Sequence, residues 1–217
     1  MYIPKHFREE DLAVLQGLMR AHSFATLVST QEDGVPVATH LPVLLEAEPA
    51  PYGTLKAHLA LGNPQWRTLQ EEREVLMMFQ GPHSYISPSW YEVELSVPTW
   101  NYATVHAYGR PRLITEREEL YRHLSALVAT YEGGFPQPWQ LERLPMDYVE
   151  KMMKGVVGLS IEITRLEGKY KMSQNRSVQD QQQVIEQLQT AEDPTIHEVA
   201  TIMRGQVTPA NVETSSR

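Results

Sequence analysis

The sequence predicts an α+β protein in which about six strands form an antiparallel sheet that closes into a small barrel, with helices at its periphery. Short apolar, β-rich segments follow one another through tight turns, and amphipathic helices are concentrated near the ends of the chain and between the later strands. No internal repeat with a period of roughly 20–50 residues occurs, which excludes solenoids and propellers. With 217 residues, 41% of them hydrophobic, the chain can enclose a real core.

The first predicted elements are a helix and a two-stranded hairpin. Within residues 7–22, apolar residues recur every three or four positions behind three acidic residues, a pattern typical of a helix start. Residues 23–30 and 35–46 are apolar, β-rich runs, and the Asp33-Gly34 pair between them suits a tight turn. We therefore expect the helix to lie on a sheet that begins with this hairpin.

A third strand is predicted at residues 53–61, and a short helix follows it at 62–72. Asn63 is a good N-cap for this helix, and Pro64 suits its first position. Because the first amides of a helix can bind an anion, this turn is a candidate anion site.

An aromatic segment lies between two further strands, which are predicted at residues 74–81 and 101–115. Residues 84–109 contain two of the four Trp and several of the ten Tyr, although only 8% of the whole chain is aromatic. We expect this segment to form a loop whose rings share one role.

The next predicted elements are two helices. Residues 115–134 predict a helix in which Thr115 and Glu118 have the spacing of a capping box and a pair of glycines forms the end. A shorter helix is expected at residues 146–155.

The last predicted elements are one strand and two helices. A long strand is expected at residues 156–173, with an interruption around Glu167 and Gly168. Two short helices follow, capped by Ser177 and Asp193. We divide the chain into a barrel domain, a C-terminal helical extension and a flexible tail, at residues 1–176, 177–206 and 207–217.

Composition excludes several classes of function. The absence of cysteine excludes disulfides, thiolate metal sites and cysteine nucleophiles. A net charge of −8 without any Lys/Arg-rich block argues against direct binding of nucleic acid. No apolar run of about 18 residues and no targeting segment occurs, so we expect a soluble cytoplasmic protein that does not enter membranes.

Common catalytic motifs are also missing. The chain contains no glycine-rich nucleotide motif, no G-x-S-x-G and no H-E-x-x-H. Four histidines, His40, His58, His83 and His106, could converge from separate strands and loops, but a hydrogen-bonded structural role is the more common one for such residues.

The residues around the aromatic segment suit a planar ligand with a phosphate tail, which needs aromatic walls, polar groups for the ring edge and an anion site. The walls would come from Tyr85, Trp90, Tyr91, Trp100 and Tyr102, the edge groups from Thr39, Ser87, Asn101, Gln174 and Asn175, and the anion site from Asn63, Trp66 and Arg67. A hydrophobic core or a dimer interface would be enriched in the same rings, and the spacing alone does not decide between these readings.

Five segments, in this order, resemble the PaiB family of FMN-binding proteins, which are also described as negative transcriptional regulators: "THLPVLL", "HLALGNPQW", "YISPSWY", "VPTWNYATVHAYG" and "KMSQNRS". The resemblance extends over about residues 1–204. It implies a six-stranded antiparallel split β-barrel, shared with pyridoxamine-phosphate oxidases and flavin reductases. It also implies a homodimer that binds FMN at the subunit interface.

The resemblance also implies which residues bind the cofactor. Residues 38–43 correspond to the strand whose backbone passes the flavin ring, and residues 58–66 to the segment that holds the phosphate. In the oxidases, this segment carries Arg or Lys beside Ser. This chain departs from that pattern, so helix amides, Lys56 and Arg67 are the groups expected to bind the phosphate. The cofactor-binding residues expected are Thr39, His40, Leu41, His58, Asn63, Gln65, Trp66, Arg67, Tyr85, Ser87, Trp100, Asn101, Tyr102, Lys171 and Gln174.

The function predicted first is that of an FMN-binding homodimer in regulation or redox sensing. The alternatives are a flavin-dependent oxidoreductase or flavin reductase, whose chemistry would come from the cofactor rather than from a protein acid or base, and a haem-binding barrel that uses a histidine such as His58 or His106. Direct repression of transcription is disfavoured by the charge and by the absence of a helix-turn-helix pattern.

Overall fold

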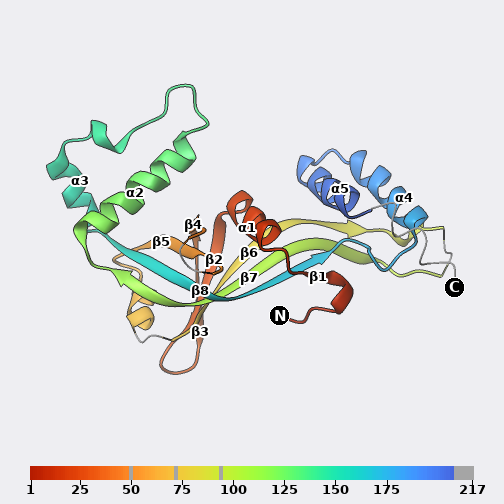
Figure 1. The fold of residues 1–217 in the computed structure, drawn as a ribbon, viewed down its shortest axis with the longest axis horizontal. Coiled ribbons are helices and arrows are strands. Elements are labelled where there is room, and N and C mark those ends of the chain that lie inside the picture. The colour runs from red at the N-terminus through yellow and green to blue at the C-terminus, as the bar shows by residue number, and fades with distance from the viewer. Residues whose placement is uncertain (49–50, 71–72, 93–94, 208–217) are drawn as a thin grey trace. The chain divides into compact units, whose positions relative to one another are not determined.

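The structure is a computed structural model that describes residues 1–48, 51–70, 73–92 and 95–207 (Figure 1). All of the predicted tail except Val207 lies outside these ranges. The strands are β1 (Arg8–Glu9), β2 (Phe24–Thr30), β3 (Pro36–Pro42), β4 (Leu44–Glu46), β5 (Thr54–Ala60), β6 (Val75–Ile86), β7 (Thr99–Ile114) and β8 (Val156–Lys171). The α-helices are α1 (Leu12–Ala21), α2 (Arg117–Glu132), α3 (Met146–Met153), α4 (Val178–Gln189) and α5 (Pro194–Gln206). Four short 3-10 helices are η1 (Lys5–Phe7), η2 (Pro64–Gln70), η3 (Pro88–Trp90) and η4 (Leu141–Arg143).

The strands form one eight-stranded sheet in the order β3-β2-β6-β7-β8-β5-β4, with β1 paired to β8. The pairs β2–β3, β2–β6, β4–β5, β5–β8 and β1–β8 are antiparallel. The α+β class and the antiparallel sheet are therefore confirmed. The prediction of six strands in a closed barrel is wrong, because over the described residues the path has ends at β3 and β4 and does not close.

Two short strands account for the difference in number. The apolar run 35–46 was expected to form one strand, but Val43 separates β3 from β4. The backbone amide of Val43 donates to the carbonyl of Ser23 over 2.9 Å. The second, β1, has only two residues and lies inside the region predicted as the first helix, so α1 begins at Leu12. Strands of two or three residues are too short to show alternation in a sequence.

The chain divides into two compact units, each built from separate stretches of sequence. Unit 1 consists of residues 1–18, 80–105 and 167–217, and unit 2 of residues 19–79 and 106–166. The long strands β6, β7 and β8 contribute residues to both.

In unit 2, the predicted hairpin between β2 and β3 is confirmed. Thr30 pairs with Pro36, and Gly34 has a φ of 84°, a left-handed conformation that favours glycine. The carboxylate of Asp33 accepts a hydrogen bond from the Val35 amide over 3.0 Å, which closes the turn.

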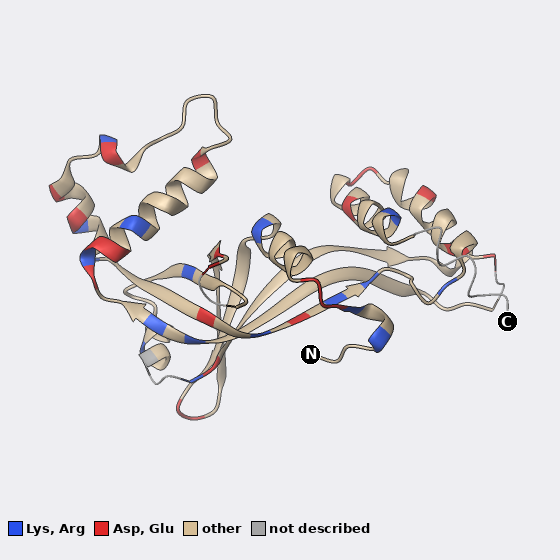
Figure 2. Cartoon of the chain, viewed as in Figure 1, with Lys and Arg blue, Asp and Glu red and all other residues tan. Residues whose placement is uncertain are grey.

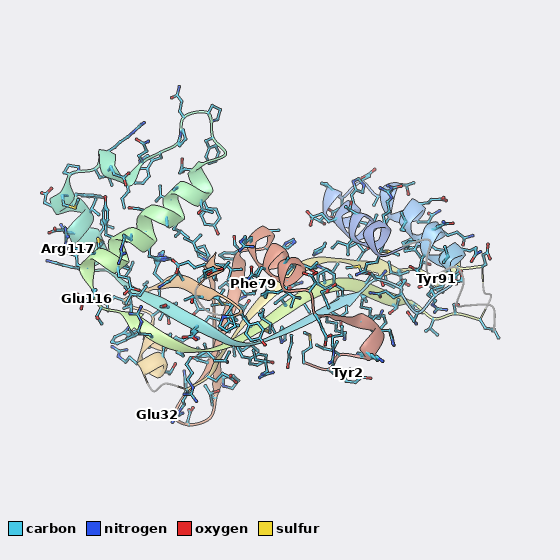
Figure 3. All side chains as sticks on the ribbon, viewed as in Figure 1. Tyr2, Glu32, Phe79, Tyr91, Glu116 and Arg117 are labelled. Carbon is cyan, nitrogen blue, oxygen red and sulfur yellow. The ribbon has the colours of Figure 1, made fainter. Side chains whose placement is uncertain are left out.

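Also in unit 2, α2 and α3 pack on the ends of β7 and β8 (Figure 1) through a small core of Ile114, Leu120, Val149 and Met153. Helix α2 ends at the predicted glycines, but the predicted capping box is wrong. The N-cap is Glu116, at the start of the helix in Figure 3, and its side chain makes no capping hydrogen bond. One residue of displacement removes Thr115 from the position that a capping box requires.

In unit 1, the expected interruption of the last strand is wrong, because β8 runs without a break through Gly168. This glycine pairs with Glu9 of β1, and a Cβ atom at its position would lie 2.2 Å from a methyl carbon of Leu15. The glycine therefore serves a close packing contact with α1 and not a turn.

The two C-terminal helices of unit 1 form as predicted and lie side by side in Figure 1. Ser177 caps α4 by accepting a hydrogen bond from the Asp180 amide over 3.1 Å. Asp193 caps α5 by accepting one from the Thr195 amide over 2.9 Å. None of the helices in the described ranges combines the length and the apolar character that crossing a bilayer requires.

Candidate functional site

A polar cluster in unit 2 joins three of the residues predicted to bind the cofactor. Asn63, which follows β5, donates its side-chain amide to the hydroxyl of Thr39 on β3 over 2.9 Å. That hydroxyl in turn donates to the side-chain oxygen of Gln65. The Asn63 side-chain oxygen accepts from the Gln65 backbone amide over 3.0 Å, so Asn63 caps the turn as predicted.

Gln65 lies inside the protein, where it connects two strands. Its side chain is 1% exposed and donates to the carbonyl of Leu27, the carbonyl of Val37 and the hydroxyl of Ser29, over 3.1–3.3 Å. These bonds use the amide within the protein, and they indicate that Gln65 holds the turn against β2 and β3.

The short helix predicted after Asn63 is present, as a seven-residue 3-10 helix, η2. Trp66 donates its indole N–H to the carbonyl of Leu61 over 3.0 Å, and the Arg67 guanidinium lies 5.0 Å from the centre of the Trp66 ring. Arg67 also lines a groove with the acidic residues Glu32 and Asp33. Arg67 is therefore the only basic residue lining that groove within the described ranges, and it faces two carboxylates there.

The remaining predicted residues of unit 2 lie on β3 and β5. His40 is exposed and its ring stacks near Phe24, with 6.4 Å between ring centres, whereas Leu41 is 3% exposed and belongs to the core. His58 is partly buried, and its Nδ1 atom lies 3.2 Å from Nε2 of His123 on α2. Burial lowers the pKa of His58.

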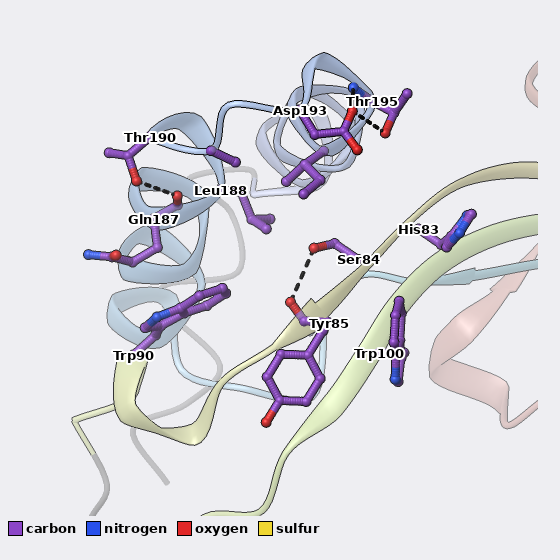
Figure 4. Close-up of a pocket in the computed structure, with 12 residues that line it drawn as sticks. His83, Ser84, Tyr85, Trp90, Trp100, Gln187, Leu188, Thr190, Asp193 and Thr195 are labelled. Carbon is purple, nitrogen blue, oxygen red and sulfur yellow. Dashed lines mark hydrogen bonds between the residues drawn. The ribbon is translucent and has the colours of Figure 1, made fainter.

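An aromatic pocket lies in unit 1 (Figure 4). It encloses about 550 Å³ and is formed by the end of β6, η3, the start of β7 and the turn between α4 and α5. Its walls include three aromatic residues from the predicted set of ligand walls: Tyr85, Trp90 and Trp100. Tyr85 and Trp100 are 46% and 53% exposed, which leaves large apolar ring surface open to a ligand or a partner.

The rings of this pocket contact one another. The ring centres of Tyr85 and Trp100 lie 6.1 Å apart in an edge-to-face arrangement, and the imidazole of His83 lies 6.2 Å from Trp100. Alternating residues of β6 place Tyr85 and His83 on one face of the strand, while Ser84 between them is buried.

The opposite side of the pocket comes from the helical turn, which carries polar groups. Asp193 and Thr195 line it, and the Asp193 carboxylate accepts from both the backbone amide and the hydroxyl of Thr195. These hydrogen bonds lower the pKa of Asp193. The pocket thus pairs aromatic walls with an ionised carboxylate at its rim.

Two predicted edge groups lie inside unit 1. Asn101 is fully buried, with its amide nitrogen 3.0 Å from the Ser173 hydroxyl and 3.5 Å from the sulfur of Met203. Gln174 donates to the carbonyl of Tyr170 and accepts from the amide of Met172. Both side chains are engaged within the protein, as Gln65 is in unit 2.

The other predicted residues of unit 1 lie near the start of β7. The Lys171 ammonium donates to the Trp100 carbonyl over 2.6 Å and to the Thr99 hydroxyl, and its pKa is lowered by burial and by nearby cations. The ammonium of Lys169 lies over the ring of Tyr102, 5.2 Å from the ring centre. Ser87 caps η3.

The predicted residues therefore divide into eight in unit 2, at positions 39–67, and seven in unit 1, at positions 85–174. Within each unit the structure brings several together, notably Thr39, Asn63 and Gln65, and the pair Tyr85 and Trp100. His123 was not selected from the sequence, because it lies within an ordinary amphipathic helix. In the described ranges, no group of three or more histidines and carboxylates is placed to hold a metal ion.

Comparison with known proteins gives matches over most of the chain. A sequence model of the family described as "Putative FMN-binding domain" matches residues 1–165. The chain is similar to the Bacillus subtilis (strain 168) protein "Protease synthase and sporulation protein PAI 2", with 42% identity over 203 residues that cover 94% of this chain and 96% of the relative.

Solved structures share the fold at low identity. The flavocytochrome Anf3 from Azotobacter vinelandii has a TM-score of 0.60 and 16% identity, over 78% of this chain and 72% of that one. The FAD and heme binding protein from Mycobacterium smegmatis has a TM-score of 0.56 and 16% identity, over 76% of this chain and 73% of that one. Identities at this level concern the fold alone.

Proposed function

The chain belongs to the FMN-binding domain family and, within it, to the PaiB family, and from this premise we propose that it is a homodimeric FMN-binding flavoprotein with a regulatory or redox-sensing role. The observation that carries the proposal is the match of residues 1–165 to the FMN-binding family. The names of two proteins of the same fold, a flavocytochrome and an FAD and heme binding protein, support a flavin as the cofactor.

The aromatic pocket of unit 1 fits the flat ring of a flavin. Its exposed Tyr85 and Trp100 rings offer stacking surface, and its volume of about 550 Å³ is within the range of pockets that enclose small-molecule ligands. The backbone that carries the Trp100 ring is anchored, because the Lys171 ammonium donates to the Trp100 carbonyl.

The polar cluster of unit 2 provides an ordered backbone beside which polar parts of the cofactor can bind. Thr39 and Asn63 hold β3 against the turn after β5, and Gln65 locks that turn from inside. We expect His40, Asn63, Trp66 and Arg67, which are exposed or partly exposed, to contact FMN, and Leu41, Gln65, Asn101 and Gln174 to support these contacts from within. When bound, FMN supplies hydride or single-electron transfer, while the protein sets its orientation and access.

The homodimer is part of the proposal because the family resemblance implies that FMN is bound at a subunit interface. In a dimer, a second copy of the chain can supply ring-bearing residues that complete each cofactor site. Exposed aromatic residues such as Tyr85 and Trp100 are also the residue types that protein interfaces favour.

We propose that any regulatory effect is indirect. Lys and Arg are interspersed with Asp and Glu in α2 and α3 (Figure 2), and the C-terminal helices offer little positive charge for phosphate contacts. Helix α4 contains neither Lys nor Arg, and α5 contains Arg204 alone. Proteins that read DNA usually present several cations to its backbone.

A flavin-dependent oxidoreductase is the second candidate, and the rim of the aromatic pocket favours it. Asp193 and Thr195 are polar groups opposite the rings, where they could orient a small substrate. Oxidation of NADH or NADPH that depends on added FMN, and that slows in the Trp100→Ala variant, would support this function.

The cofactor is tested by the visible spectrum of the purified protein and by thermal melting with and without FMN. Saturating FMN at about 100 times Kd should stabilise the protein by about 2.7 kcal/mol. Trp100→Ala should reduce this stabilisation. Trp139→Ala is the matched control, because Trp139 is 41% exposed but is outside the predicted set.

Absence of a flavin spectrum together with absence of protection by added FMN would contradict the proposal. Equal loss in the Trp100→Ala and Trp139→Ala variants would leave FMN binding standing but remove the assignment of the ring to the aromatic pocket. Sedimentation measurements with and without FMN test the dimer separately.

A further inference from the structure

A second cavity, in unit 2, combines fixed charges with a buried histidine. It encloses about 310 Å³ between the β4–β5 hairpin and α2. Its lining residues are Leu44, Glu46, Lys56, Ile114, Glu119, Arg122, His123 and Ala126. Only Lys56 among them was connected with the cofactor by sequence resemblance.

Two cations and two carboxylates line this cavity. Glu119 accepts from Arg112 over 2.6 Å and from Lys56 over 3.1 Å, and these bonds lower its pKa to about 2, so that it is ionised at neutral pH. Lys56 lies 3.8 Å from the more exposed Glu46. Arg122 bonds only a backbone carbonyl among the described residues, that of Glu118. The two cations that line the cavity, Lys56 and Arg122, therefore balance its two carboxylates, Glu46 and Glu119, and Arg112 adds a positive charge from outside the lining.

His123, which also lines the cavity, has a buried polar atom without a hydrogen-bond partner among the described residues. Its side chain is 5% exposed, and its Nε2 atom is engaged by Nδ1 of His58 at 3.2 Å. Its Nδ1 atom is buried and has no hydrogen-bond partner among the described residues. A buried polar atom without a partner costs stability, so such an atom beside a cavity points to a ligand.

The contact between the two histidines determines whether Nδ1 of His123 is a hydrogen-bond donor or an acceptor. If His58 donates its Nδ1 proton to His123, the neutral His123 ring carries its own proton on Nδ1 and becomes a hydrogen-bond donor. Burial and the nearby His58 and Lys56 lower the pKa of His123 to about 4, so the neutral ring dominates at neutral pH. The cavity then presents one neutral donor and one ammonium.

We propose that this cavity binds a single oxyanion group, a carboxylate or a phosphate, of a small ligand, with Lys56 and His123 as the recognition groups. The apolar residues Leu44, Ile114 and Ala126 would contact the rest of the ligand. Two sources have this chemistry: a free small acid and the phosphate of the flavin itself. The inference does not depend on the aromatic pocket.

The test is calorimetric titration of the full-length protein with sodium propionate and with inorganic phosphate. Lys56→Met removes the ammonium but keeps most of the aliphatic chain, and His123→Phe keeps a ring of similar size. Each should weaken binding roughly tenfold or more, as expected for loss of a hydrogen bond to a charged group. Arg117→Met is the matched control, because it breaks an ion pair with Glu150 on α2 and α3 outside the cavity.

Competition distinguishes the two sources. If the oxyanion is the phosphate of the cofactor, FMN will displace propionate and riboflavin will not. If it belongs to a free acid, both flavins will bind without displacing propionate. A flavin spectrum that survives in Lys56→Met with propionate binding lost would support this inference, and it would leave the proposed cofactor role intact.

The proposal is overturned if neither propionate nor phosphate binds to the wild-type protein, or if Lys56→Met binds both as tightly as Arg117→Met does. Should His123→Phe fail to fold by circular dichroism, Lys56→Met and the pH dependence of the wild type decide. Because a bound anion favours the protonated ring, the affinity for the ionised form of propionate, corrected for protonation of propionate itself, should rise as the pH falls from neutral towards the His123 pKa of about 4. Unchanged affinity over that interval contradicts the role of His123.

Discussion

Asn63 donates its side-chain amide to the hydroxyl of Thr39 over 2.9 Å, and this bond ties the turn after β5 to the middle of β3. The two residues are 24 positions apart, and both were selected from the sequence as cofactor contacts. Their hydrogen bond makes the turn part of the sheet and not a free loop. Substitutions around it therefore test both stability and cofactor binding.

Gln65→Leu should lower the free energy of unfolding by about 1–3 kcal/mol, because it leaves the buried carbonyls of Leu27 and Val37 without their side-chain donor. Urea denaturation measures this change. Gln182→Leu, at an exposed position of α4, should change stability by less than about 0.5 kcal/mol. Similar losses in the two variants would contradict the role of Gln65 as a brace.

Ser173 has a φ of 63° and bonds the buried amide of Asn101, so two substitutions there should separate backbone strain from hydrogen bonding. Ser173→Ala should destabilise the protein by about 1–3 kcal/mol through loss of the bond. Ser173→Gly should be more stable than Ser173→Ala by about 1–2 kcal/mol, since glycine adopts this conformation without a steric cost. Thermal unfolding of both variants measures the difference, and the reverse order would refute the assignment.

Lys171→Met should weaken protection by FMN, because the lysine ammonium bonds the Trp100 carbonyl and so anchors the backbone that carries that ring. The expected result is a smaller rise in melting temperature on addition of FMN. Lys151→Met, on the exposed face of α3, is the control and should respond to FMN as the wild type does. Full protection in Lys171→Met would show that Trp100 does not need this anchor.

His123 should make stability depend on pH in mildly acidic solution. Its pKa falls from 6.5 to about 4 in the folded protein, mainly through burial. As the pH drops below 6.5, the unfolded chain takes up the proton first, so the free energy of unfolding decreases until about pH 4. His123→Phe should show a shallower decrease across this interval in urea titrations. An unchanged slope would mean that other groups account for it.

Glu119 should contribute stability that is lost at lower pH. Hydrogen bonds from Arg112 and Lys56 lower its pKa from 4.5 to about 2, so its contribution is complete above 4.5 and disappears as the pH approaches 2. Because Arg112 is largely exposed to solvent, we expect Glu119→Gln to cost only about 1 kcal/mol at neutral pH. The variant and the wild type should converge in acid denaturation, and a constant difference would contradict this.

Much of the fold could be predicted because its long elements have strong patterns. The Asp33-Gly34 turn, the strands on either side of it and the caps Ser177 and Asp193 depend on neighbouring residues only. The missed strands β1 and β4 have two and three residues, and they exist through pairing with β8 and β5. Gly168 looked like an interruption because its packing partner Leu15 is far away in the sequence.

The candidate site was predictable in residue type but less so in side-chain direction. Tyr85 and Trp100 were selected as aromatic walls with polar rims, and both line the aromatic pocket. Asn101 was selected as a polar group for the ring edge and Gln65 as part of the phosphate-binding turn, yet their amides are turned inward because buried carbonyls and hydroxyls need donors. His123 was missed because its partner, His58, is 65 positions earlier.

The division of each unit into separate stretches also governs the order in which the protein can be completed during translation. The last stretch of unit 2 ends at residue 166, whereas unit 1 needs the strand end and helices that come after that position. During synthesis, all segments of unit 2 are therefore available before the last segment of unit 1 has been made. Nascent chains halted after residue 166 has left the exit tunnel, but before α4 and α5 have left it, should resist protease within unit 2 and remain sensitive within unit 1.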